Sequence, residues 1–170
     1  MTRLPFPSPT LPAGSRSEVL LGYLDYFRHV VVTKVEDLSE PDLRRGRLPS
    51  GWSPIELVQH LTHVERRWLV WGFEGRPVDD PWADRRDGRW HVPPEVPVAE
   101  VLGALAAQAE QTRRIVSGHD LANVGRPGER WDGAEPATLE RVLLHLVQEY
   151  ARHTGHIDVA RELVDGTVGE

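Results

Sequence analysis

The chain has 170 residues, of which 39% are hydrophobic and 27% charged, an ordinary mixture for one globular domain. Its net charge of −6 argues against a general binder of nucleic acid or of anionic membranes. It contains no cysteine, which excludes disulfides, cysteine-ligated zinc and a cysteine nucleophile. No apolar run reaches 18 residues and the N-terminus lacks a hydrophobic signal core, so we expect a cytoplasmic protein without a membrane span.

The pattern in chain order begins with a proline-rich segment at residues 1–14, which we interpret as an N-terminal arm. One domain should follow over residues 15–166, with a short tail at residues 167–170. Its first amphipathic helix is predicted at about residues 16–35, where Ser15 and Glu18 fit a capping box. A short helical turn is expected at residues 40–43.

The second helix has the clearest start signal in the chain. Ser53 is placed to cap it, Pro54 suits its first position, and Glu56 completes a capping box. Apolar spacing carries this helix to about Phe73.

Two further helices complete the pattern. The third is predicted at about residues 98–116, and the fourth runs from near Pro136 to Asp165, with Gly166 as the terminating residue. No strand pattern competes with these helices. The sequence therefore predicts an all-α fold, a four-helix bundle.

A long connection rich in tryptophan and proline separates the second and third predicted helices, at residues 75–97. Loops of this length are usually functional or disordered. Because this one contains Trp82 and Trp90, we expect it to be ordered and packed over one end of the bundle. A second long connection covers residues 117–135.

Two polar residues interrupt the apolar stripe of the fourth helix. Glu149 and His153 lie one turn apart and point in the same direction as Leu146. A buried carboxylate needs a compensating charge, and a divalent cation with an imidazole would provide it. His60, on the flank of the apolar face of the second helix, can complete a set of two histidines and one carboxylate. Three protein ligands would leave a coordination position open for catalysis.

Each of these residues also has a plainer interpretation. His60 could be a core histidine bonded to a backbone carbonyl, and Glu149 with His153 could form a purely structural pair. His145, His156 and His63 are candidates for supporting or substrate-binding roles, with flank positions on their helices as the alternative. Three arginines could bind anionic groups or could be solvated surface charges, namely Arg66, Arg67 and Arg152.

Two segments resemble a known family. Residues 51–61 are similar to the second-helix motif of the DinB-like (YfiT-like) metalloprotein superfamily, and residues 143–156 resemble its last-helix motif. The pattern of Glu, Ala-Arg-His and Gly-His in the second segment looks like an actinobacterial branch that includes a mycothiol S-transferase. Mycothiol-dependent maleylpyruvate isomerases are relatives of that branch.

The resemblance implies a fold, a metal and a co-substrate. The fold would be a bundle with up-down-down-up topology. A divalent metal, usually zinc with nickel or iron as alternatives, would be held by His60, Glu149 and His153. A low-molecular-weight thiol such as mycothiol would be conjugated to a small electrophile, so a small-molecule substrate is expected and a homodimer is conceivable.

Three hypotheses about function stay open at this point. The first is the metal-dependent thiol S-transferase, in which the thiolate is the nucleophile. The second keeps the metal but activates water for hydrolysis, or oxygen if the metal is iron. The third is a non-catalytic stress-response bundle with a structural metal or none. A structural zinc would need a fourth protein ligand, for which His145 and His156 are the candidates.

Overall fold

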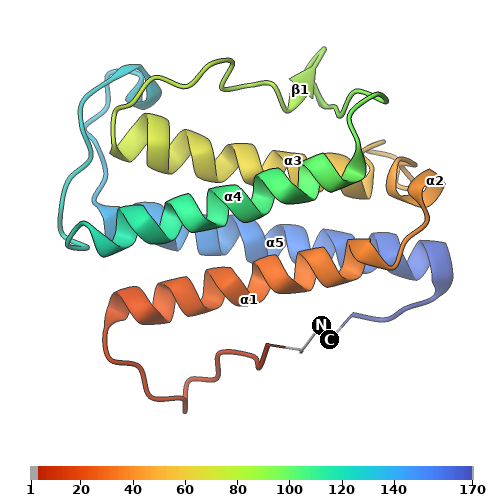
Figure 1. Cartoon of the computed structure of the whole chain (residues 1–170), viewed down its shortest axis with the longest axis horizontal. Coiled ribbons are helices and arrows are strands. Elements are labelled where there is room, and N and C mark those ends of the chain that lie inside the picture. The colour runs from red at the N-terminus through yellow and green to blue at the C-terminus, as the bar shows by residue number, and fades with distance from the viewer. Residues whose placement is uncertain (1–3, 170) are drawn as a thin grey trace.

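A computed structural model describes residues 4–169, and their regular secondary structure is almost entirely helical. The four longest helical segments pack side by side (Figure 1). These segments are α1 (Arg16–Glu36), α3 (Pro54–Glu65) with its continuation η1 (Arg66–Phe73), α4 (Val98–Ser117) and α5 (Leu139–Asp165). In Figure 1, α1 and α5 run in one direction, and α3 and α4 run in the other. The predicted all-α class is confirmed.

The helix boundaries follow local capping chemistry. The hydroxyl of Ser15 accepts a hydrogen bond from the N–H of Glu18 at 3.1 Å, and the predicted capping box at Ser53 is present. The short helix α2 (Glu40–Leu43) forms where it was expected. At the far end of the chain, Gly166 ends α5 with a φ of 75°, a conformation that glycine adopts without strain.

The start of α5 differs from its prediction near Pro136. Thr138 is the capping residue, and its hydroxyl accepts from the N–H of Arg141. The preceding residues are held extended because Thr138 forms an isolated β-bridge with Val124, and the N–H of Leu139 bonds to the carbonyl of Asn123 at 2.9 Å. The helix therefore begins three residues later, at Leu139.

The second long helix changes its winding halfway along. It is an α-helix as far as Glu65 and a π-helix from Arg66 to Phe73. π-helical segments are rare and often occur at functional sites. The wider winding shifts the later side chains around the helix axis, and Arg67 is buried although it was predicted only as an anion binder or a surface charge.

The long connection of residues 74–97, the crossing connection, runs over α3 along the length of that helix (Figure 1). It does not cover one end of the bundle, as was expected. It contains a hairpin of two short antiparallel strands, β1 (Arg85–Arg86) and β2 (Arg89–Trp90). The expectation of no strands was wrong here, because two-residue strands are too short to give an alternating pattern. Gln59 of α3 holds the connection in place by donating to the carbonyls of Ala83 at 3.3 Å and His91 at 3.2 Å.

An apolar core joins the four long helices, and a buried ionic network lies inside it. The carboxylate of Glu65 is fully buried and accepts two hydrogen bonds from Arg28, at 2.9 and 2.6 Å. It also accepts from the hydroxyls of Thr112, at 2.6 Å, and Tyr150. Every one of the four long helices contributes a side chain to this network, which was not predicted from the sequence. Among residues 4–169, the helices lack the continuous apolar length that a membrane span requires.

Candidate metal centre

The three predicted ligands come together in space. His60 from α3 and Glu149 and His153 from α5 each place a potential ligand atom within 4.8 Å of the other two. His60 and His153 are buried, whereas the side chain of Glu149 is 28% exposed. Glu149 therefore lies at the border of the core, and the neighbouring Tyr150 occupies the fully buried position that the sequence pattern gave to the glutamate.

The four-residue spacing on α5 aligns the two ligands of that helix. One turn separates them, so their side chains share a face. Nε2 of His153 lies 3.3 Å from Oε2 of Glu149. The hydrogen bond from His153 lowers the pKa of the Glu149 carboxyl, with a further contribution from the charge of His145. The carboxylate is therefore ionised at neutral pH and available as a ligand.

His60 is oriented by a carboxylate from the crossing connection. Its Nδ1 lies 2.9 Å from Oδ2 of Asp84, which is fully buried. Because an ionised carboxylate can only accept, Nδ1 is the protonated nitrogen and Nε2 keeps its lone pair for a ligand. A histidine whose second nitrogen donates to a carboxylate is the common arrangement in protein metal sites.

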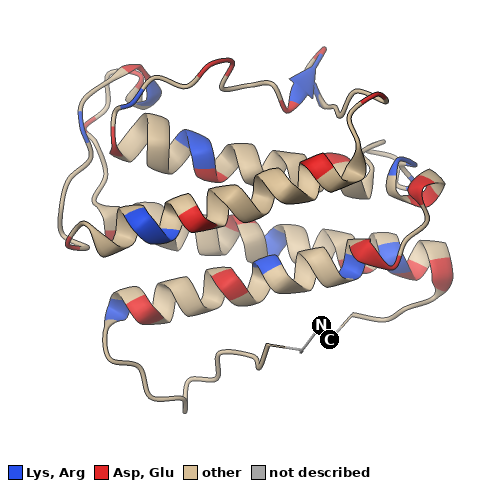
Figure 2. Cartoon of the chain, in the orientation of Figure 1, with Lys and Arg blue, Asp and Glu red and all other residues tan. Residues whose placement is uncertain are grey.

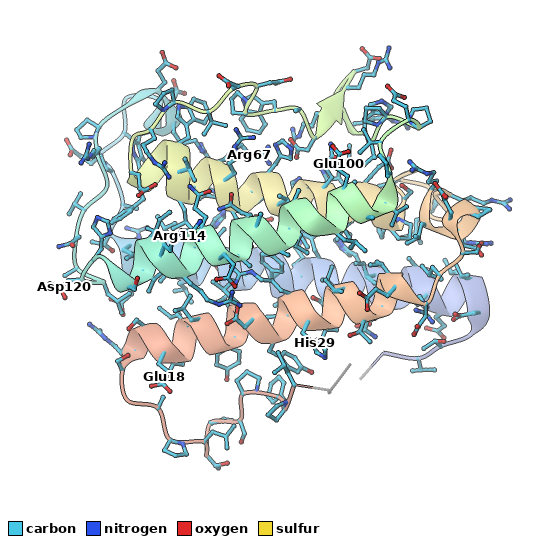
Figure 3. All side chains as sticks on the ribbon, in the orientation of Figure 1. Glu18, His29, Arg67, Glu100, Arg114 and Asp120 are labelled. Atoms are coloured by element: carbon cyan, nitrogen blue, oxygen red, sulfur yellow. The ribbon has the colours of Figure 1, made fainter. Side chains whose placement is uncertain are left out.

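Asp84 is itself held by Arg67. The guanidinium donates to Oδ1 of Asp84 at 2.6 Å and to Oδ2 at 3.2 Å, and it also bonds to the carbonyl of Pro81 at 2.9 Å. Figure 3 shows Arg67 between its helix and the crossing connection. Burial alone would raise the pKa of Asp84, but the hydrogen bonds from His60 and Arg67 lower it to about 2. Asp84 is therefore charged at neutral pH and accepts a hydrogen bond from the Nδ1–H group of His60.

Two tryptophans form an aromatic wall at the site. The ring of Trp90 stacks on His60 at a centroid distance of 4.2 Å, and it meets the ring of His153 edge to face at 5.2 Å. Trp52 lies 6.1 Å from Trp90 and 5.9 Å from His156. Burial in these surroundings lowers the pKa of His60. The imidazole is therefore neutral at pH 7, which is the form that binds a metal.

Three further candidate histidines, His156, His145 and His63, lie outside the cluster. His156 lies 3.2 Å from His153 between their Nδ1 atoms, and His145 lies 3.6 Å from the carboxylate of Glu149. Among the described residues, the group of close ligand atoms contains neither of them. His63 is half-buried and responds to the charges of Asp84 and Arg67 rather than to those of the cluster. Burial lowers its pKa.

The arginine candidates separate into different roles. Arg152 is exposed on α5, Arg66 is half-buried, and Arg67 is 3% exposed and bound to Asp84. The interpretation of Arg67 as a solvated surface charge was wrong. The shift to π-helical winding at Arg66 accompanies this inward position.

Sequence reasoning missed Asp84 and Trp90 as parts of the site. One available signal was the composition of the long connection, which predicted order but not the path of the chain. Local sequence could have revealed the hairpin itself, because Asp87-Gly88 is a strong two-residue turn signal.

The fold and the cluster together define a helical protein with a possible His–Glu–His metal site. A family model described as Mycothiol-S-transferase matches residues 19–166. The chain belongs to this family, in agreement with the resemblance in the two helical motifs. None of the curated proteins compared with the chain matches it.

Proposed function

We propose that this protein is a metal-dependent transferase that conjugates a low-molecular-weight thiol to a small electrophile. The family to which the chain belongs indicates that the thiol is mycothiol. The metal is a divalent cation, zinc in the first instance, held by His60, Glu149 and His153. The observation that carries the proposal is the convergence of these three side chains within 4.8 Å, in a chain whose family is that of the mycothiol-S-transferases.

The donor set suits the proposed metal. Two imidazole nitrogens and one carboxylate oxygen are ligands that zinc accepts in catalytic sites, with one position left open. His145 and His156 are the two candidates for the fourth protein ligand that a purely structural zinc would require. Among the described residues, both lie outside the group of close ligand atoms, which supports an open coordination position.

The residues of the chain have separate tasks in this proposal. Asp84 fixes the tautomer and orientation of His60, and Arg67 keeps Asp84 ionised. Trp90 covers one face of His60 and keeps water away from it. A bound zinc would supply the positive charge that stabilises the thiolate form of the incoming thiol. Since the chain has no cysteine, the reacting sulfur must come from the co-substrate.

We also propose that the bundle is of the DinB-like type with up-down-down-up order, which the helix directions in Figure 1 support. The protein acts in the cytoplasm on a small-molecule substrate, without nucleic acid or membrane partners. A homodimer stays a prediction.

Metal analysis and a conjugation assay test the proposal together. Protein purified through a tag without histidine should contain one zinc per chain. Its conjugation of 1-chloro-2,4-dinitrobenzene should depend on mycothiol and should be lost after chelation and restored by zinc. A rate that is independent of thiol would refute the transferase, and iron at one per chain would favour oxygen chemistry. If the purified protein contains no metal and the His60→Ala variant folds normally, the non-catalytic bundle is favoured.

A further inference from the structure

A cavity of about 490 Å³ lies between the hairpin of the crossing connection and the start of α3. One wall is formed by Trp52 and Glu56, and the other by the hairpin residues Arg85, Arg86, Arg89 and Trp90. Figure 2 shows strand β1 of the hairpin in the blue of basic residues, with acidic residues in red beside it. The cavity is thus a concave space with three arginines among its lining residues, in a chain whose net charge is negative.

The turn of the hairpin places two of these arginines side by side. Asp87 and Gly88 have φ values of 51° and 76°, as a type I′ turn requires, and Arg86 pairs directly with Arg89 across it. Side chains of directly opposed residues share one face, with Cβ atoms about 4.5–5.5 Å apart, and like charges at such positions repel each other. An anion between the two guanidinium groups would offset that repulsion.

No carboxylate of the described chain neutralises this pair. Arg86 and Arg89 take part in no ion pair within residues 4–169, and Arg85 lies over the ring of Trp82 at 5.3 Å. The carboxylate of Glu56, on the opposite wall, is engaged with Ser53, whose N–H and hydroxyl donate to it at 2.8 and 2.9 Å. Asp87, at the turn, is the other acidic residue in the lining. The arginines therefore outnumber the acidic groups in the cavity.

The cavity shares a wall with the candidate metal centre. Trp90 lines the cavity and also stacks on His60 at 4.2 Å. Trp52 lines it too, and lies 5.9 Å from His156. A planar molecule that binds in the cavity can therefore contact the indole side chains of Trp52 and Trp90.

We propose that this cavity anchors the electrophilic substrate through an anionic group, of the carboxylate class, which binds between Arg86 and Arg89. This inference rests on the proposed function and adds the substrate class: small, planar electrophiles that carry a carboxylate. In the reaction, the thiolate sulfur forms a bond to the electrophilic carbon of a chloroarene. The carbon–chlorine bond breaks, chloride leaves with the bonding electrons, and the thiol proton passes to solvent.

Binding without turnover gives the first test. Calorimetric titration of zinc-free protein with 3,5-dinitrobenzoate, and with neutral 1,3-dinitrobenzene, compares ligands that differ in the carboxylate. The double variant Arg86→Gln/Arg89→Gln should bind the benzoate at least tenfold more weakly than the wild type, with binding of the neutral ligand unchanged. Equal affinity of wild type and variant for the benzoate would overturn the anchor.

A matched control removes the same charge elsewhere. Arg114 and Arg141 are exposed at the end of the bundle remote from the hairpin, where Figure 3 labels Arg114. Arg114→Gln/Arg141→Gln should bind the benzoate within twofold of the wild type. An equal loss in both double variants would show a general effect of net charge and would also overturn the anchor.

Turnover then assigns the anionic group to one substrate. With mycothiol and zinc, the KM for 4-chloro-3,5-dinitrobenzoate should rise at least tenfold in Arg86→Gln/Arg89→Gln, whereas the KM for 1-chloro-2,4-dinitrobenzene should stay within twofold. A rise in the KM for mycothiol instead would place the anion on the thiol and would overturn the assignment. Carboxylate-dependent binding without any transfer would refute the proposed function but support the anchor.

Discussion

Two polar clusters share helices α3 and α5, and they differ in how completely their members are paired. In the network of Glu65, both carboxylate oxygens accept hydrogen bonds from Arg28, and Thr112 and Tyr150 complete the set. In the cluster of His60, Glu149 and His153, one nitrogen of His60 is held by Asp84 and the other is left for a ligand. Both clusters contain buried ionisable side chains, so burial alone does not distinguish them. The incomplete set of partners of the His60 cluster does.

The clusters are also close along the chain, which makes the comparison testable. Glu65 follows His60 by five residues on the helix that begins with α3, and Tyr150 follows Glu149 directly on α5. Substitutions in the closed network should therefore affect folding, and substitutions in the open cluster should affect metal affinity. Each kind of variant serves as a control for the other.

The largest effect is expected from Glu65→Ala. Removing this carboxylate leaves the guanidinium of Arg28 buried without its main partner, which should cost about 3–5 kcal/mol of unfolding free energy. Urea denaturation of the zinc-free protein measures the loss. If this variant does not fold, Glu65→Gln keeps the shape of the side chain and should still lose most of that amount. A loss below about 1 kcal/mol in Glu65→Gln would show that the network is not structural.

The next largest effect should come from Glu149→Gln. The neutral amide removes the anionic ligand, so zinc affinity should fall by more than about 100-fold, beyond the range expected for residues that only support ligands. Competition with a chromophoric chelator gives the affinity. His145→Gln is the matched control, because His145 lies next to Glu149 but outside the group of close ligand atoms. Equal affinity in the two variants would exclude Glu149 as a ligand.

Asp84→Asn should have an intermediate effect. The amide can no longer hold the proton of His60 on Nδ1 by charge, and zinc affinity should fall by about 10–100-fold. Arg67 also loses its ionic partner, so stability must be measured separately by urea denaturation. Arg67→Gln separates the two roles, because it removes the guanidinium but keeps the bond from His60 to Asp84. If Arg67→Gln lowers zinc affinity as much as Asp84→Asn does, the loss of affinity in Asp84→Asn is not caused by a change in the orientation of His60.

The difference between the clusters also explains how far the sequence could predict the molecule. Helix starts at Ser15 and Ser53 depend on nearby residues, so local rules located them. Glu149 and His153 could be paired because four residues of helix bring side chains onto one face. Placing His60 beside them required only that two apolar faces pack together.

Asp84 and Glu65 could not be assigned in this way. The bond from Asp84 to His60 depends on the path of a 24-residue connection (residues 74–97) whose hairpin contains only two-residue strands. Glu65 was overlooked because its partners are distributed over the other three long helices, with Arg28 37 residues and Tyr150 85 residues away in the sequence. Such contacts exist only once the bundle has formed, and no local pattern encodes them.

The smallest effect, and the sharpest test of the comparison, is expected from Tyr150→Phe. This residue is adjacent to Glu149, but its hydroxyl bonds to Glu65 and its ring is fully buried. Losing one hydrogen bond to a charged group, while Arg28 and Thr112 still satisfy the carboxylate, should cost about 1.5 kcal/mol of unfolding free energy. Zinc affinity should remain within about twofold of the wild type, because the ring still packs and the position of Glu149 on α5 is kept. A loss of zinc affinity comparable to that of Glu149→Gln would show that the two clusters act as one unit, since phenylalanine removes only the atom that reaches Glu65.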